Sequence, residues 1–213
     1  IDAQVLGLEK QDTANSRLKI AILDANMVHI AEQNALFDKQ GRAHAVLKVS
    51  KPNLWSPETP YLYKVVVKAI SHGETQDQYV LNTGLRTISV SKEHGFQLNG
   101  VTRKIKGVCL HHDLGPLGAA VNKAALIRQV REMKEMGADA IRTSHNMPSE
   151  MQMQVCDSMG MMVMAESFDM WKYPKVKNGY SRFFDEWSDR DITNLVLHHR
   201  NHPAIVMWSI GNE

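Results

Sequence analysis

Four groups of residues that can exchange protons or form hydrogen bonds each follow an apolar run of the chain. Carboxylates in such groups can act as general acids, bases or nucleophiles, and imidazole and amide groups can hold a polar substrate. In parallel α/β proteins the C-terminal ends of the strands form the edge at which substrates bind. We therefore expect one site to be lined by His111-His112-Asp113, His145-Asn146, Glu166 with Asp169, and Asn212-Glu213.

The pair Asn212-Glu213 has the clearest placement of the four groups. It follows the apolar run 204–207, which lies between Pro203 and Gly211 and is typical of a strand buried on both faces. Surface glutamates are common, so an Asn-Glu pair alone indicates little. Its position at the end of a buried strand favours a functional carboxylate.

The histidines raise the alternative of a zinc site. His111 and His112 are adjacent and would point to opposite faces of a strand, and neither a helical His-x-x-x-His pair nor a cysteine pair completes a tetrahedral set around them. We therefore expect no metal site and no cofactor. A second histidine group, His198, His199 and His202, follows an expected helix, where cations favour the helix dipole, and we interpret it as structural.

Arg142 lies within an expected buried strand and therefore needs a carboxylate partner. Pointed into a barrel, it could keep a catalytic carboxylate ionised. It could equally form a purely structural ion pair, and both interpretations stay open.

The elements that must position these residues fall into two halves. Residues 1–91 alternate apolar and polar side chains between turn formers, which predicts a small antiparallel β-sandwich. Residues 92–213 open with an Asn99-Gly100 hairpin signal. Strands then alternate with helices for which Asn122, Ser149 and Ser181 are expected N-caps. The expected strands at 105–110, 140–143, 161–165 and 204–207 make half of a parallel barrel, truncated after its fourth strand.

An incomplete barrel would leave unpaired strand edges. The strands that begin near Ile105 and Ala204 would each lack a neighbour, and such edges recruit other chains. We also expect four inward side chains to lose their covering layer, namely Val108, Ile141, Val163 and Val206. Self-association of the chain is the consequence.

Composition narrows the possible partners. The formal charge is +2 and no dense basic run is present, so nucleic acid and anionic membranes are not expected partners. Cys109 and Cys156 have neither metal-ligand spacing nor a disulfide framework, and we interpret both as buried thiols. Ile1 begins inside an expected strand without a signal peptide, so we expect the natural N-terminus to be missing. Periplasmic and cytoplasmic locations both stay open.

Three segments carry a resemblance to a known family. Asp139-Ala140-Ile141-Arg142-Thr143-Ser144-His145-Asn146-Met147-Pro148, followed by Cys156-Asp157-Ser158-Met159-Gly160, resembles the first signature of glycoside hydrolase family 2. Residues 200–213 resemble the second signature, and residues 55–63 are similar to the exit of the family's immunoglobulin-like domain. The resemblance implies an immunoglobulin-like β-sandwich followed by the first half of a (β/α)8 TIM barrel.

The resemblance also implies a function and roles for the residues. It implies a retaining exo-β-glycosidase acting on terminal β-galactosides, with a β-linked glycoside or oligosaccharide as ligand. Its nucleophile comes from a later strand, so the 213-residue chain alone is expected to be inactive. Met170 stands where some members carry a magnesium ligand, which puts a metal in doubt. The implied roles are acid/base for Glu213, nucleophile support for Arg142, and substrate binding for Asn212, His145, His111, His112, Asp113 and Glu166.

Two alternatives to a β-galactosidase stay open. β-Glucuronidase and β-mannosidase belong to the same family and differ at residues that lie mostly outside this chain. The chain could also be a non-catalytic module that binds a carbohydrate or a protein partner. An exposed aromatic row would favour the module, and residues 1–90 hold too few aromatic residues to supply one.

Overall fold

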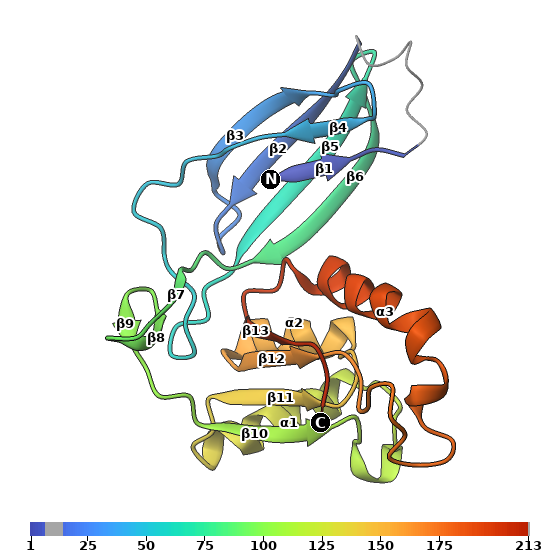
Figure 1. Cartoon of the computed structure of the whole chain (residues 1–213). Coiled ribbons are helices and arrows are strands. Elements are labelled where there is room, and N and C mark those ends of the chain that lie inside the picture. The colour runs from blue at the N-terminus through green and yellow to red at the C-terminus, as the bar shows by residue number, and fades with distance from the viewer. Residues whose placement is uncertain (7–14, 213) are drawn as a thin grey trace. The chain divides into compact units, whose positions relative to one another are not determined.

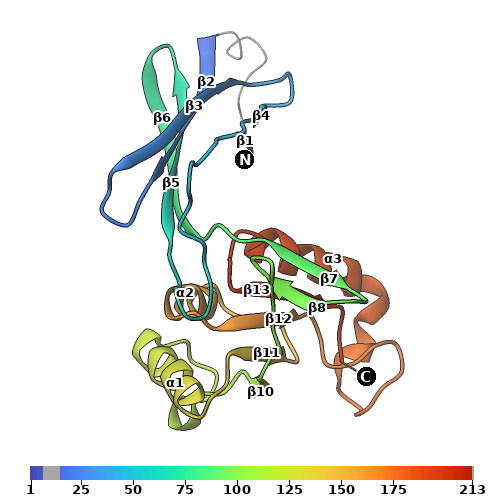
Figure 2. The ribbon, with the colours of Figure 1, turned by 90° about the vertical axis from the view of Figure 1, so that its left-hand side faces the viewer.

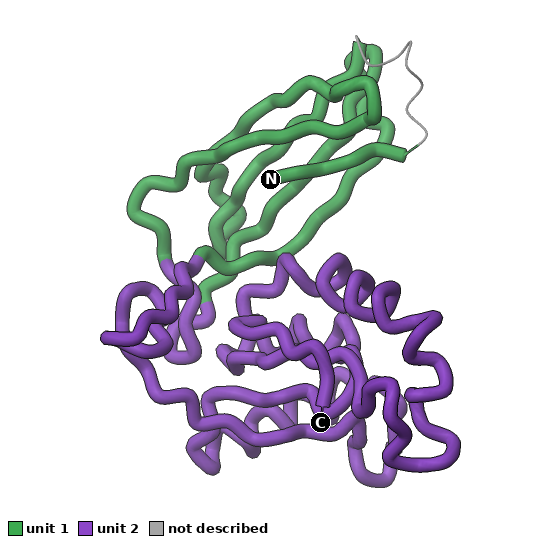
Figure 3. The backbone as a smooth tube through the Cα atoms, in the orientation of Figure 1, with its two compact units in different colours: residues 1–53, 61–85 green, residues 54–60, 86–213 purple. Residues whose placement is uncertain are grey.

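The computed structural model describes residues 1–6 and 15–212. The chain divides into two compact units, drawn in different colours in Figure 3. The first unit holds residues 1–53 and 61–85, and the second holds residues 54–60 and 86–213.

The first unit is an antiparallel β-sandwich (Figure 1). Its larger sheet has the order β3-β2-β5-β6 and its smaller sheet pairs β1 with β4. The alternating residues Leu18, Ile20 and Ile22 of β2 are buried in one core with Ala43 of β4, as the sequence predicted. The strands are β1 (Asp2–Gln4), β2 (Ser16–Leu23), β3 (His29–Leu36), β4 (Arg42–His44), β5 (Tyr63–Ser71) and β6 (Glu74–Thr83).

A three-stranded antiparallel sheet opens the second unit. It consists of β7 (Ile88–Ser91), β8 (Gly95–Leu98) and β9 (Val101–Thr102). Asn99 and Gly100, which connect β8 to β9, have φ angles of 54° and 77°. Positive φ at both positions is the geometry for which Asn-Gly is favoured, so the expected hairpin is confirmed.

The segment 54–60 belongs to the second unit, although the sequence places it inside the first half of the chain. Trp55 is fully buried, and its indole Nε1–H donates to the carbonyl oxygen of Asp157 at 2.8 Å. Asn99 Nδ2 donates to the carbonyl oxygen of Trp55 at 3.0 Å. The compact units divide after Leu85, whereas the sequence-based domain boundary follows residue 91.

The rest of the second unit is a parallel sheet with helical crossovers (Figure 2). The strand order is β10-β11-β12-β13, and α1 and α2 lie on one face of the sheet. The strands are β10 (Gly107–His111), β11 (Ala140–Ser144), β12 (Met162–Glu166) and β13 (Ile205–Ser209); the helices are α1 (Lys123–Glu135), α2 (Glu150–Met159) and α3 (Phe184–His199).

Two of the three expected helix caps are confirmed. Asn122 Oδ1 accepts from the Ala125 N–H at 3.0 Å, and Ser149 Oγ accepts from the Gln152 N–H at 3.2 Å. Ser181 is not a cap, because it lies in a 3₁₀ turn, Tyr180–Arg182, that leads directly into α3. Acidic side chains in the first turn, Asp185 and Glu186, instead complement the positive end of the helix dipole.

The side chains on the two faces of the parallel sheet are not distributed as the sequence predicted. Strand pairing sets Cys109 beside Arg142, and Arg142 beside Met164, so these three residues share one face of the sheet. Successive residues of a strand point to opposite faces, so Ile141 and Val163 lie on the other face. Ile141 and Val163 are 1% and 0% exposed, whereas Cys109 is exposed, so we assign Ile141 and Val163 to the face that the helices cover. The prediction that these two residues, and Val108, which pairs with Ile141, point inward and lose their cover is therefore wrong. Val163 pairs with Ile205, and Val206 lies at an irregularity in this pairing, so the prediction for Val206 is not tested.

The two cysteines occupy different environments. Cys156 on α2 is buried, as expected, and burial raises the pKa of its thiol. Cys109 is exposed, because it lies on the uncovered face of β10, a strand that pairs on one side only within the described sheet. The expectation of a buried thiol at Cys109 is wrong.

Self-association of the chain stays a prediction, now resting on strand edges. Within the sheet of the described residues, β10 and β13 each pair with one neighbour. Arg86 Nη2 donates to the carbonyl oxygen of Ile205 on β13, and we expect other backbone groups of the two edge strands to be available to another chain. We expect light scattering coupled to size exclusion to show dimers or larger species at tens of micromolar. A single monomeric species of 24.0 kDa would contradict this expectation.

Gly160 lies against Pro57 of segment 54–60. Its φ is +69°, and a Cβ added there would lie 2.4 Å from the carbonyl oxygen of Pro57. We expect Gly160→Ala to lower the free energy of unfolding by roughly 2–4 kcal/mol, from left-handed strain and overpacking together. Urea unfolding measures the loss.

Gly137→Ala is the matched control for Gly160→Ala. Gly137 also has a positive φ, +94°, but a Cβ there would have no neighbour within 4 Å. We expect this control to show only the conformational part, about 1–2 kcal/mol. Equal losses in the two variants would contradict the close packing of Pro57 on Gly160.

None of the helices in the described part of the chain has the length and apolar character needed to cross a membrane.

Candidate active site

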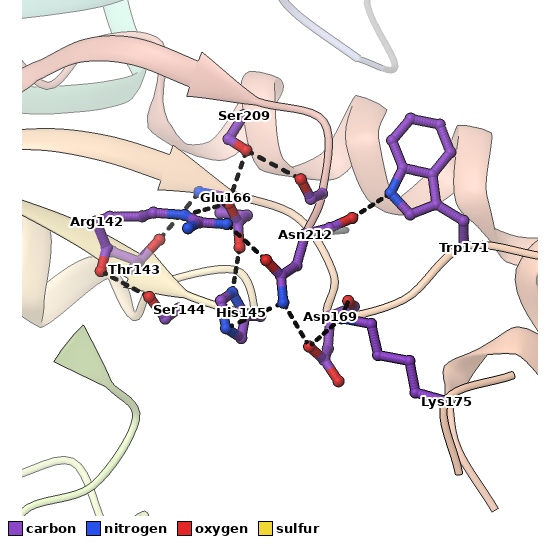
Figure 4. A network of polar contacts seen from close by, with 11 residues as sticks. Arg142, Thr143, Ser144, His145, Glu166, Asp169, Trp171, Lys175, Ser209 and Asn212 are labelled. Carbon is purple, nitrogen blue, oxygen red and sulfur yellow. Dashed lines mark hydrogen bonds and ion pairs between the residues drawn. The ribbon is translucent and has the colours of Figure 1, made fainter. Parts of the chain in front are cut away.

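The C-terminal ends of β11, β12 and β13 bring polar side chains into one network (Figure 4). Arg142 lies on β11, and His145 is the first residue after this strand. Glu166 is the last residue of β12. Ser209 ends β13, and Asn212 follows three residues later. The parallel arrangement thus collects residues that are distant in sequence at one edge.

Glu166 is the centre of the network. Its side chain is 0% exposed. Its Oε2 accepts from Arg142 Nε at 2.6 Å and from Ser209 Oγ at 2.7 Å, and its Oε1 lies 2.5 Å from His145 Nδ1. Burial acts to raise the pKa of Glu166, but the hydrogen bonds from Arg142, Ser209 and His145 outweigh it and lower the pKa. The buried carboxylate is therefore ionised near neutral pH.

The contact with Glu166 fixes the state of the His145 ring. A carboxylate oxygen can only accept, so Nδ1 of His145 carries a proton. Asn212 Nδ2 lies 3.3 Å from His145 Nε2, and because an amide nitrogen can only donate, Nε2 is the acceptor in this contact. The rings of His145 and His111 also meet edge to face, with centroids 5.2 Å apart. His111 is thereby brought to the network.

The Asn212 side chain is held from three sides. Its Oδ1 accepts from Arg142 Nη2 at 3.0 Å, and its Nδ2 donates to Asp169 Oδ1 at 3.1 Å as well as to His145. Hydrogen bonding from Asn212, helped by nearby Lys175, holds the pKa of Asp169 below its ordinary value despite some desolvation. The amide of Asn212 therefore has one fixed orientation.

The backbone around Asn212 is fixed as well. The Asn212 N–H donates to the carbonyl oxygen of Phe168 at 3.0 Å, and the indole N–H of Trp171 donates to the carbonyl oxygen of Asn212. Gly211 has a φ of +148°, and a Cβ there would lie 2.9 Å from the Phe168 ring. Glycine is therefore the residue that fits this position without strain. Glu213, the next residue, lies outside the described residues.

His112 and Asp113 form contacts within their own loop. His112 Nε2–H donates to the carbonyl oxygen of Ala119 at 3.0 Å, and Asp113 Oδ1 accepts from the Gly115 N–H at 2.6 Å. With His111, both residues line a small pocket together with Leu114, Gly118, Val121, Leu126, Gln129, Ser149 and Gln152. The structure therefore connects His111 to the Glu166 network and gives the other two residues a local role in shaping the loop.

Three participants were not assigned a role from the sequence. Ser209, Phe168 and Trp171 hold Glu166 and Asn212 in place. Phe168 also stacks on Tyr180 with ring centroids 4.9 Å apart, which anchors the loop after β12. A concentration of aromatic residues after the third strand is the sequence signal that could have indicated this loop.

Both units of the chain match models of one protein family. The model described as the TIM barrel domain of glycosyl hydrolases family 2 matches residues 88–213, and a second model, described as glycosyl hydrolases family 2, matches residues 1–86. The chain therefore belongs to glycosyl hydrolase family 2. Its fold is the family's immunoglobulin-like sandwich followed by the first part of the TIM barrel, which confirms the predicted fold class.

Individual relatives agree with this assignment. The chain is 43% identical to a β-galactosidase of Bacteroides ovatus over 215 residues, which is 99% of this chain and 25% of that protein. It superposes on a β-glycosidase of Bacteroides vulgatus with a TM-score of 0.89 at 37% identity, covering 97% of this chain and 26% of that one. A β-glucuronidase of Bifidobacterium dentium, solved with coumarin-3-O-glucuronide, gives 0.81 at 26% identity, covering 93% and 32%. The chain thus spans about a quarter of the length of the β-galactosidase it matches.

Proposed function

We propose that this chain supplies part of the active site of a retaining exo-β-glycosidase that acts on terminal β-galactosides. The observation that carries the proposal is the fixed amide of Asn212, held by Arg142, His145 and Asp169 at the C-terminal edge of the parallel sheet. TIM-barrel enzymes place their catalytic groups at this edge. Glu213 follows Asn212 directly, and we assign it the acid/base role.

Retaining hydrolysis defines what Glu213 has to do. In the first step its carboxyl group protonates the oxygen of the leaving group while a second carboxylate attacks the anomeric carbon. In the second step the Glu213 carboxylate takes a proton from water, which cleaves the glycosyl-enzyme bond. The nucleophile must lie about 5 to 5.5 Å from Glu213. We place it outside residues 1–213.

The network suggests roles for the residues around Glu213. We assign Asn212 and His145, with His111 beside His145, to the sugar subsite, where Asn212 Oδ1 keeps a second lone pair for a sugar hydroxyl. Glu166 fits a positioning role better than the substrate contact expected from the sequence, because it is 0% exposed and both carboxylate oxygens accept from protein groups. Through Glu166, the guanidinium of Arg142 is held toward Asn212, where it can also support the nucleophile.

The preference for a galactoside can be tested by measuring the activity of the gene's full product on different glycosides. We expect kcat/KM for an aryl β-galactoside to exceed that for the matching β-glucuronide and β-mannoside by at least about 100-fold, because the wrong sugar leaves polar groups of the site unpaired. The 43% identity to a β-galactosidase supports this order. A preference for the glucuronide would contradict the proposed substrate but not the acid/base role of Glu213. Glycan binding with no hydrolysis of any of the three would favour the non-catalytic module.

The 213-residue chain alone is expected to hydrolyse no glycoside. One carboxylate without its nucleophile cannot carry out a double displacement. The purified chain should therefore release nitrophenol from an aryl β-galactoside no faster than its Glu213→Ala variant does. Turnover that Glu213→Ala abolishes would show that the nucleophile lies within these residues.

A further inference from the structure

A second cluster of titratable side chains lies outside the candidate active site. It consists of Glu150, the first residue of α2, His199, the last residue of α3, and His202, which precedes β13. Each residue offers one ligand atom, and the three atoms lie within 4.8 Å of one another. The cluster joins the two helices to the start of a strand.

His199 presents an unused nitrogen to this cluster. The residue is 1% exposed, and its Nε2–H donates to the carbonyl oxygen of Pro148 at 3.0 Å. A carbonyl oxygen can only accept, so Nε2 carries the proton in this contact and Nδ1 of the neutral ring presents a lone pair. This nitrogen is buried without a hydrogen-bond partner and lies 3.7 Å from Glu150 Oε2.

His202 presents its Nε2 to the same carboxylate oxygen. Its Nδ1 lies 2.5 Å from Asp157 Oδ2, and its Nε2 lies 3.2 Å from Glu150 Oε2. A carboxylate bonded to the far nitrogen is the arrangement that orients metal-ligating imidazoles in proteins. Asp157 is itself held in place, because its Oδ1 accepts from the Ala204 N–H at 3.0 Å.

We propose that Glu150 Oε2, His199 Nδ1 and His202 Nε2 bind a divalent transition-metal ion of the zinc type. Ligands at about 2.0–2.2 Å from tetrahedral zinc lie roughly 3.4 Å apart, which is close to the separations of both nitrogens from Glu150 Oε2. The cation gives the lone pair of buried His199 a partner that no described protein group supplies. The Glu150 side chain is 57% exposed, so water can reach the fourth position.

The role of this ion is structural. Its ligands come from α2, from α3 and from the turn into β13, so binding fixes these elements relative to one another. The site departs from the sequence-based interpretation of His199 and His202 as histidines that only complement a helix end. The sequence could not indicate it, because Glu150 is distant in the chain and gives no ligand spacing.

Cobalt is the probe for the experiment, because tetrahedral Co²⁺ absorbs in the visible region and Zn²⁺ does not. The 213-residue chain, stripped with a chelator, is titrated with Co²⁺ and then with Zn²⁺. We expect visible bands that saturate at one equivalent and disappear as zinc displaces cobalt. Zinc at 100 times its dissociation constant should raise the melting temperature by roughly 5–10 °C.

Three variants locate the ion. Glu150→Gln should weaken cobalt binding at least tenfold, and it should fold normally because Glu150 is exposed. His199→Gln should weaken binding similarly, whereas His198→Gln, an exposed neighbour on α3, should bind like the unaltered chain. Absence of the bands at millimolar cobalt would overturn the proposal. Equal binding by all three variants would overturn it too, by locating the ion elsewhere.

Discussion

Glu213→Gln in the gene's full product is expected to lower kcat/KM for β-galactosides with poor leaving groups by roughly 10²- to 10⁴-fold, the usual contribution of general acid–base catalysis. A glutamine cannot protonate the leaving oxygen. Substrates whose leaving groups need no proton should still glycosylate the enzyme, and the glycosyl-enzyme should then accumulate, because no base activates water. Steady-state rates with a poor and a good leaving group, together with the burst of aryl product, measure both effects.

Two controls make this result specific, a chemical rescue and a second variant. Azide should restore turnover of the activated substrate by Glu213→Gln, because it attacks the glycosyl-enzyme without a general base. Glu135→Gln, an exposed glutamate at the end of α1, should leave both rates unchanged. Unaltered turnover of poor substrates by Glu213→Gln would remove Glu213 from the acid/base role.

Glu166→Gln is expected to damage both stability and activity. The substitution leaves Arg142 without its buried anionic partner and places an amide opposite the His145 N–H. Removing one member of a buried pair costs about 3–5 kcal/mol, and the part-exposed arginine places our expectation at roughly 2–4 kcal/mol. In the gene's full product, displacement of Arg142, His145 and Asn212 should lower kcat/KM on the order of 100-fold. Urea unfolding and steady-state kinetics give the two numbers.

Glu58→Gln is the matched control, because Glu58 pairs with Arg103 in the same unit but its side chain is 63% exposed. We expect a loss below about 1 kcal/mol and no change in activity. Similar losses in Glu58→Gln and Glu166→Gln would contradict the central role of the buried carboxylate.

The pH dependence of stability tests the charge on Glu166 separately. Its pKa is lowered in the folded protein, so its contribution to stability is complete above the unfolded carboxyl pKa of about 4.3 and is lost as the pH falls through the folded value. The stability difference between the unaltered protein and Glu166→Gln should therefore shrink below about pH 4. A difference that stays constant from pH 7 to pH 3 would indicate a neutral carboxyl group in the folded state.

Local signals in the sequence were sufficient for many elements of the fold. Asn122 and Ser149 cap α1 and α2, and Asn99-Gly100 forms the hairpin turn, because each depends on residues within one turn of chain. The faces of β11 and β12 were not predictable in this way. A strand that is apolar on both sides shows no alternation, so only the crossovers decide that Ile141 faces the helices and Arg142 does not.

The candidate site was predictable in its location and less so in its contacts. Parallel strands must bring Arg142, His145, Glu166 and Asn212 to one edge, and the structure does bring them together. The sequence could not show that Glu166 uses both oxygens on protein donors. That fact depends on Ser209, a residue whose small hydroxyl gives no signal by itself.

The most direct test of the retaining mechanism with Glu213 as acid/base is the site of a trapped intermediate. The gene's full product is treated with an activated 2-deoxy-2-fluoro-β-galactoside, which forms the glycosyl-enzyme and hydrolyses it slowly, and the labelled peptide is identified by mass spectrometry. The account predicts one label, on a carboxylate outside residues 1–213, and the same label in Glu213→Gln. A label on Glu213, Asp169 or Glu166 would contradict it, since that residue would then be the nucleophile.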